Sequence, residues 1–179
     1  YELMKLRLLN ASHQGLCYFG YLAGHHMVHD VMADIRFQDF LLAYMEREAT
    51  PTLKELPGVD LDAYRRQLIA RFGNAAVKDT VPRLCAESSD RIPKWLLPVV
   101  RENLAAGRDV TLSAAIVASW ARYAEGTDEQ GNPTKIVDRL SERVQENASG
   151  NHTDILSFIR DRGIFGDLVD AEPFTKAYS

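Results

Sequence analysis

Several sequence patterns that mark common enzyme sites are missing from this chain of 179 residues. It has no GxGxxG segment after a strand-like run, no GxxxxGK[ST], no GxSxG and no HExxH. These patterns form dinucleotide sites, phosphate-binding loops, serine nucleophile turns and zinc sites, respectively. We therefore expect no cofactor-binding residues and no metal site within this chain.

Long apolar runs and a surplus of basic residues are also missing. No run approaches the roughly 20 apolar residues that cross a bilayer. The net charge of −4 and the isoelectric point near 5.7 argue against the clustered basic surface that binds phosphate backbones. We expect neither a membrane nor a nucleic acid among the partners.

Cysteine is scarce, and methionine is not the first residue. Cys17 and Cys85 are far apart and have no metal-ligand spacing, which is typical of buried, reduced thiols in a cytoplasmic protein. No signal peptide precedes them. The chain enters helix-like sequence directly after Tyr1, so we interpret it as a piece of a longer polypeptide.

The apolar residues that are present, 46% of the chain, follow helical spacing. No stretch alternates with the period of a strand, so the predicted fold class is all-α. Residues 2–32 predict one long, central, largely buried helix, within which Gly15, Gly20 and Gly24 would allow close packing. Further helices are predicted at 35–48 after Asp34, 61–72 after Asp60, 75–86, 93–106, 111–124, and in two final segments beginning near Asp138 and Asn151. Pro93 is expected early in the helix predicted at 93–106, and Pro98 is expected to kink it.

Three polar side chains share one side of the predicted first helix. At ~100° per residue, with Lys5 at 0°, His13 falls near ~80° and Asn10 near ~140°. Leu9 and Leu16 fall beside Lys5, which suggests an apolar setting for its amine.

These three residue types can perform acid–base chemistry on an alcohol. Burial lowers the pKa of a lysine toward the range in which it can accept a hydroxyl proton. Asn10 could donate to an oxygen that becomes negative, and His13 could hold a neighbouring hydroxyl. On spacing alone the alternative stays open, because a lysine near a helix start is ordinarily solvated. An asparagine or histidine on a packed helix is ordinarily just hydrogen-bonded.

The motif Lys-x4-Asn-x2-His, formed by Lys5, Asn10 and His13, resembles the signature of the polyol-specific long-chain dehydrogenases and reductases, the mannitol dehydrogenase family. That family includes mannitol 2-dehydrogenase, arabinitol dehydrogenase and fructuronate reductase. The similar segments follow in order along almost the whole chain, at residues 4–13, 20–24, 51–53, 58–61, 92–94, 97–98, 126–131 and 164–167.

The resemblance implies that residues 1–179 are the C-terminal, substrate-binding and catalytic lobe of a two-domain enzyme. An N-terminal Rossmann domain, absent here, would bind NAD or NADP, so this piece alone is expected to be inactive. The reaction would be metal-independent oxidation of a sugar alcohol, or reduction of a ketose or uronate. The resemblance assigns Lys5 as general base, Asn10 as an oxyanion donor and His13 as a substrate-orienting residue. It further assigns Arg83 and Arg91 to substrate binding.

Competing interpretations remain at this stage. Within the family, the amino-acid sequence at residues 11–14 and 81–85 is more similar to the mannitol branch than to the fructuronate or arabinitol branches. His25, His26 and His29 form a cluster in which only His25 and His29 have helical ligand spacing, and we expect no metal there. A third interpretation, a non-catalytic helical interaction module, predicts an exposed Lys5 with no cleft beside it.

Overall fold

The computed structural model describes all residues 1–179, and every regular element in it is helical. Only two isolated β-bridges occur, Met27–Thr80 and Thr127–Pro133, which confirms the predicted all-α class. The first half contains α1 (Glu2–Met4), η1 (Lys5–Asn10), α2 (Ala11–Leu22), α3 (Val28–Met32), α4 (Ile35–Tyr44), η2 (Met45–Ala49), η3 (Thr50–Thr52), α5 (Leu61–Phe72), η4 (Ala75–Val77) and α6 (Val81–Cys85). The second half contains α7 (Ser88–Trp95), α8 (Leu97–Ala105), α9 (Thr111–Ala124), α10 (Ser141–Ser149), η5 (Gly150–His152), η6 (Phe158–Arg160), α11 (Arg162–Phe165), η7 (Leu168–Asp170) and α12 (Glu172–Tyr178).

The predicted first helix is continuous from Glu2 to Leu22 but does not reach residue 32. Gly24 adopts a φ of +92°, a conformation that favours glycine and ends the helix. A short extended segment follows, and directly after it the Val28 N–H, at the start of α3, donates to the Asp79 carbonyl. The prediction of one helix over 2–32 is therefore wrong in its last third, because a pairing with distant residue Asp79 redirects the chain.

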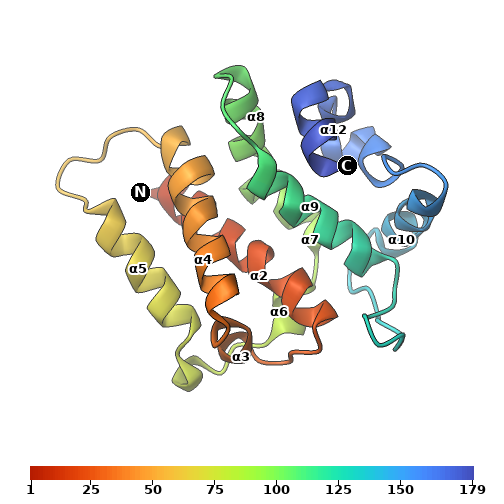
Figure 1. The fold of residues 1–179 in the computed structure, drawn as a ribbon, viewed down its shortest axis with the longest axis horizontal. Coiled ribbons are helices and arrows are strands. Elements are labelled where there is room, and N and C mark those ends of the chain that lie inside the picture. Colours follow the sequence, from red (N-terminus) through yellow and green to blue (C-terminus); the bar gives the residue numbers. More distant parts are fainter.

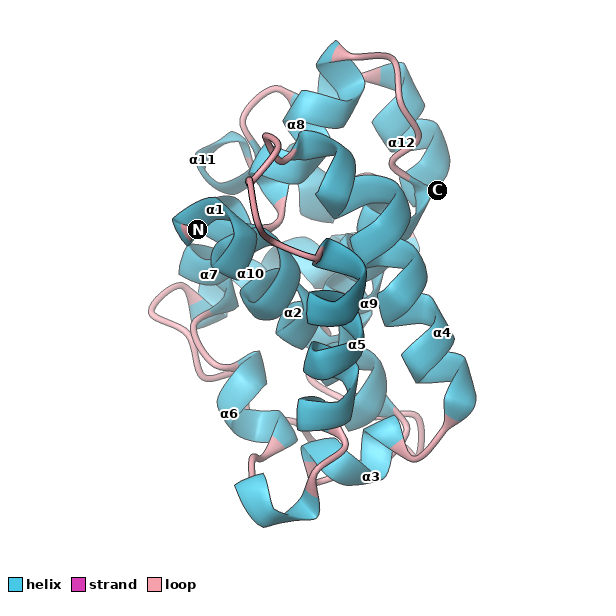
Figure 2. Cartoon of the chain, turned by 90° about the vertical axis from the view of Figure 1, so that its left-hand side faces the viewer, coloured by secondary structure: helices cyan, strands magenta, loops and turns pink.

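The helix α2 runs through the centre of the molecule, where α4, α6 and α9 pack against it (Figures 1 and 2). Leu16 is completely buried there. A Cβ atom on Gly15 would lie 2.9 Å from Leu41, and one on Gly20 would lie 2.6 Å from Val31. The predicted central helix and the close-packing role of these two glycines are confirmed.

Two predicted helices match their elements closely, and a third is extended by a π-helical turn. The helices α5 and α9 begin and end as predicted, with the Asp60 carboxylate accepting the Ala63 N–H at the start of α5. The Asp34 carboxylate caps α4 by accepting the Arg36 N–H. The predicted segment 35–48 consists of α4 and the π-helical turn η2.

The proline-containing region differs from the prediction of one helix over 93–106. Pro93 lies inside α7, which begins earlier, at Ser88, and Pro98 lies in the first turn of the separate helix α8. The start of α7 is fixed by Asp138, whose carboxylate accepts the Ser89 N–H at 2.9 Å. Asp138 also accepts the Leu140 N–H ahead of α10, so its capping serves two elements.

Two other predicted segments are shorter or differently capped. The predicted helix 75–86 is divided into η4 and α6, between which Lys78 has a left-handed φ of 53°. Asn151 does not start a helix; its side-chain oxygen accepts the Phe158 N–H and so holds the start of η6.

Glu48 is a buried carboxylate that stabilises the start of α9. Its oxygens accept the N–H groups of Leu112 and Ser113, each at 2.7 Å, and also the Ser113 hydroxyl. Burial raises the pKa of Glu48, and these three hydrogen bonds oppose that shift by stabilising the ionised carboxylate. Glu48 lies in η2, so this contact fixes η2 against the start of α9.

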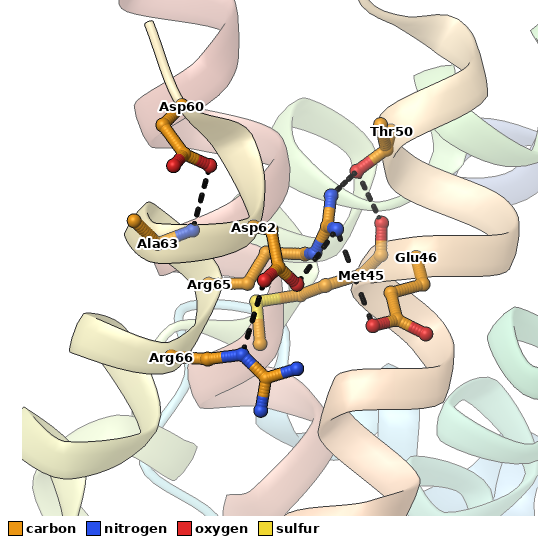
Figure 3. A network of polar contacts seen from close by, with 8 residues as sticks. All are labelled: Met45, Glu46, Thr50, Asp60, Asp62, Ala63, Arg65 and Arg66. Atoms are coloured by element: carbon orange, nitrogen blue, oxygen red, sulfur yellow. Dashed lines mark hydrogen bonds and ion pairs between the residues drawn. The ribbon is translucent and has the colours of Figure 1, made fainter.

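A second polar network joins α5 to the end of η2 (Figure 3). The Arg65 guanidinium donates to the Thr50 hydroxyl at 3.1 Å, and that hydroxyl donates to the Met45 carbonyl at 2.6 Å. The Arg65 side chain is only 12% exposed, whereas the neighbouring Arg66 side chain is 68% exposed. The network therefore holds the π-helical turn η2 in place from outside.

Candidate active site

A pocket of about 410 Å³ opens between α2, α3, α5 and α6. Its wall combines one side chain of the long first helix with the link between α5 and α6. The lining residues are His13, Val28, His29, Arg71, Phe72, Asn74, Val77, Lys78, Asp79, Thr80 and Arg83. Most of them are polar, which suits a ligand that carries several hydroxyl or carboxyl groups.

His13 forms the inner wall of this pocket. Burial lowers the pKa of His13 to about 4, against an opposing effect of Asp79 and a smaller reinforcing effect of Arg83. Its ring lies 4.7 Å from that of Phe72, between ring centroids. His13 is therefore a neutral imidazole at neutral pH, able both to donate and to accept a hydrogen bond.

Arg83 lies at the rim of the pocket and is held by Asp79. Two parallel hydrogen bonds of 2.7 Å join its Nε and Nη2 to the two carboxylate oxygens. The Arg83 guanidinium lowers the pKa of Asp79, and the arginine side chain remains 59% exposed. The fixed guanidinium keeps free N–H donors that a ligand in the pocket could use.

Arg91, the other predicted substrate residue, does not line the pocket. Its Nη1 donates to the carbonyl oxygens of Arg83 and Leu84, each at 3.1 Å. Its guanidinium carbon lies 5.5 Å from the centre of the Trp95 ring. In this structure Arg91 supports the end of α6, the helix that carries Arg83.

Lys5 and Asn10 lie in η1, where the helix is π-helical. A π-helix bonds residue i to residue i+5, so each residue turns by only ~80°. Asn10 then falls near ~40° from Lys5, and His13, after three α-helical steps, near ~−20°. The three side chains span about 60° instead of the predicted 140°, so the structure brings them closer to one line than the sequence suggested.

The Lys5 side chain is exposed to solvent. This contradicts the prediction that Lys5 lies in an apolar stripe of the helix. The π-helical turn increases the angle around the helix between Lys5 and Leu16, and Leu16 lies on the completely buried side. The pocket is not lined by Lys5 or Asn10. An exposed Lys5 outside the cleft is what the interaction-module interpretation predicted.

Asn10 carries an unsatisfied group. Its side-chain oxygen Oδ1 is buried and has no hydrogen-bond partner. Buried polar atoms without a partner are rare and costly, and they occur at functional sites. The amide of Asn10 therefore has hydrogen-bonding capacity that the fold of this chain does not use.

Sequence reasoning missed Arg71, Lys78 and Asp79, which line the pocket together with His13. The one available signal was the i, i+4 spacing of Asp79 and Arg83, which is typical of an ion pair on one helical turn. Arg71 and Lys78 gave no signal, because their place in the pocket depends on how α5 packs against α3. His29 also lines the pocket, and no three metal-ligating side chains gather anywhere in the structure.

The depressed pKa of His13 predicts a specific loss of stability in acid. The unfolded chain takes up a proton at this residue near its ordinary pKa of ~6.5, whereas the folded protein does so only near pH 4. Stability present above pH 6.5 is therefore lost as the pH falls toward 4, by up to about 3 kcal/mol. Urea unfolding at a series of pH values measures this loss.

His13→Gln removes the titrating group and should flatten the dependence between pH 6.5 and 4. His152→Gln is the matched control, because the His152 side chain is 73% exposed and its replacement should leave the wild-type slope. Equal slopes for wild type and His13→Gln would contradict the assignment of this loss to His13.

Comparison with known proteins identifies close relatives over the whole chain. The family model described as the mannitol dehydrogenase C-terminal domain matches residues 1–179. The chain is 38% identical to the mannitol 2-dehydrogenases of Phaeosphaeria nodorum and Aspergillus fumigatus, over 93% of its own length in each case. It spans only 29% and 33% of the length of these two curated relatives.

Solved structures agree with these matches. A Pseudomonas fluorescens mannitol 2-dehydrogenase, solved as a ternary complex with NAD and D-mannitol, superposes with a TM-score of 0.95 at 36% identity. The match covers 99% of this chain and 36% of that one. A D-sorbitol dehydrogenase in substrate-free form gives a TM-score of 0.87 at 29% identity, with coverage of 99% and 37%. As for membranes, none of the helices combines the length and apolarity that spanning a bilayer requires.

Proposed function

Because this chain belongs to the mannitol dehydrogenase family as its C-terminal domain, we propose that it is the substrate-binding and catalytic lobe of an NAD(P)-dependent polyol dehydrogenase of the mannitol 2-dehydrogenase type. The reaction would interconvert D-mannitol and D-fructose. The observation that carries the proposal is the long first helix, which carries Lys5 and Asn10 in its π-helical turn and, one turn further on, His13 in the wall of a polar pocket.

Each side chain on this line has a proposed role. Lys5, in its neutral form, accepts the proton of the reacting hydroxyl. The Asn10 side-chain N–H donates to the same oxygen as negative charge develops on it. Neutral His13 and the Arg83 guanidinium bind and orient the neighbouring hydroxyls of the substrate, and Arg91 acts by supporting Arg83.

The residues of this lobe suit the substrate end of the reaction, not the dinucleotide. No glycine-rich turn joins a strand to a helix here, since the structure contains no strand, so we propose that a Rossmann domain elsewhere in the polypeptide holds NAD or NADP. Hydride acceptance from the carbinol carbon is the chemistry that the cofactor supplies when bound. This lobe alone should therefore be inactive.

The exposure of Lys5 places a requirement on the rest of the protein. A solvated lysine stays protonated at neutral pH and cannot act as a base. We propose that the cofactor-binding domain covers the face that carries Lys5 and Asn10, desolvating the amine and completing the site.

A second substrate class is favoured by one feature of the pocket. Arg71, Lys78 and Arg83 bring three cationic groups to its wall, and Asp79 is the only carboxylate there. A sugar acid such as a fructuronate would place its carboxylate against these cations. The names of the curated relatives above favour mannitol, an uncharged polyol. The uronate is therefore the second candidate, and arabinitol is an alternative polyol.

The test is an assay of the complete polypeptide that carries this lobe. Purified protein is incubated with NAD or NADP and with D-mannitol, D-arabinitol, D-fructose or fructuronate, and the nicotinamide absorbance is followed. We expect mannitol oxidation and fructose reduction with the highest kcat/KM, unchanged after treatment with a chelator. Preference for fructuronate would support the second candidate, and no turnover of any substrate would favour an interaction module.

A further inference from the structure

One backbone carbonyl in the first helix lacks its ordinary partner. In an α-helix the Arg7 carbonyl would accept the N–H of Ala11. Here the Ala11 N–H donates to the carbonyl of Leu6 instead, in the i to i+5 pattern of η1. The change from π-helical to α-helical bonding therefore leaves the Arg7 carbonyl without a helical donor.

A side chain from another helix takes that place. The hydroxyl of Tyr44, the last residue of α4, donates to the Arg7 carbonyl oxygen at 3.0 Å. Tyr44 is completely buried, so no water can replace this bond. In an α-helical register the Arg7 carbonyl would bond to Ala11, and the Tyr44 hydroxyl would have to share that oxygen with the Ala11 N–H or lose its acceptor. The bond thus favours the π-helical register.

Both partners of this bond are anchored from outside the helix. Tyr44 leads directly into η2, whose end is held by the Arg65–Thr50–Met45 network drawn in Figure 3. The buried guanidinium of Arg7 donates to the Thr52 carbonyl and to the Glu102 carboxylate at 2.7 Å. The hydroxyl and the carbonyl are therefore held in position by separate contacts.

We propose that Tyr44 is a positioning residue whose hydroxyl selects the π-helical register of Lys5–Asn10 and thereby aligns Lys5 with Asn10. The proposal rests on the proposed function of those two residues. In the π-helical register they lie within ~40° of one another around the helix, and in an α-helical register they would lie ~140° apart. At ~140° the base and the oxyanion donor could not both reach one hydroxyl group of the substrate.

Tyr44→Phe in the complete polypeptide tests the proposal, because phenylalanine fills the same space and removes only the hydroxyl. Tyr18→Phe is the matched control. Tyr18 is also completely buried, and its hydroxyl contacts Gln14 and Ser88, each at 2.6 Å, away from η1. The measurements are kcat and KM against pH for polyol oxidation, thermal unfolding, and a crystal structure of each variant.

We expect Tyr44→Phe to lower kcat by roughly 10- to 100-fold, with KM within about twofold and a shifted pH profile of kcat, because alignment and not binding is lost. Tyr18→Phe should lower the unfolding temperature to a similar extent but keep the wild-type kcat and profile. The crystal structure of Tyr44→Phe should have the Ala11 N–H bonded to the Arg7 carbonyl.

The outcomes separate this inference from the proposed function. If the wild-type polypeptide oxidises no polyol, the proposed function fails, and the register of η1 in the Tyr44→Phe crystal structure alone decides the inference. A Tyr44→Phe variant that keeps the Ala11–Leu6 bond together with the wild-type kcat and pH profile overturns the inference. If both tyrosine variants lose kcat equally with an unchanged profile, the effect is a general loss of stability, which also overturns it.

Discussion

Replacement of Lys5 by alanine in the complete polypeptide should lower kcat for polyol oxidation by about 10²- to 10⁴-fold, the range of a lost general base. The wild-type rate should rise with pH as Lys5 loses its proton, since only the neutral amine can accept the hydroxyl proton. In Lys5→Ala this rise should disappear. The measurement is kcat against pH at saturating substrate.

The fold should tolerate this change, because the Lys5 side chain is exposed and its removal opens no cavity. A small external amine should restore part of the lost rate by occupying the vacated space as a base. Lys135→Ala is the matched control, because Lys135 is also exposed and lies outside the candidate site. A Lys5→Ala variant with the rate and profile of the wild type would move the role of base to His13.

Local sequence signals predicted those elements whose ends depend on nearby residues. The helix α5 is an example, because Asp60 caps it and Gly73 follows it directly. The helix α7 is the opposite case, since its start depends on Asp138, a residue 49 positions away. Periodicity carries no information about such a contact, so the proline pattern alone placed this helix too late.

The features of the candidate site likewise fall into those set by nearby residues and those set by contacts with distant residues. The identities of Lys5, Asn10 and His13 and their place within about two turns of one helix were readable from the sequence, because they lie on a single element. Their alignment was not, since it depends on the π-helical turn held by the Tyr44 hydroxyl, 37 positions away from Arg7. The cationic wall formed by Arg71 and Lys78 was also unreadable, because it depends on how α5 and the segment that follows it pack against α3.

Asn10→Ala should separate activity from stability. It should lower kcat by about 10²- to 10³-fold by removing the donor to the developing oxyanion, while leaving the rise of the rate with pH in place, because Lys5 remains the base. The change also deletes a buried oxygen that has no hydrogen-bond partner within this lobe. The folded lobe therefore loses no hydrogen bond of that oxygen, and its stability should stay equal to the wild type or increase.

The measurements for Asn10→Ala are kcat and KM against pH together with the unfolding temperature. Asn132→Ala serves as the control, because the Asn132 side chain bonds to Asp128 in an exposed loop outside the site; it should keep the wild-type kcat. A loss confined to KM would make Asn10 a binding residue instead of an oxyanion donor. A large fall in unfolding temperature together with an unchanged kcat would make it a structural one. We expect a lower kcat with undiminished stability, because Asn10 would then serve the reaction without stabilising the fold.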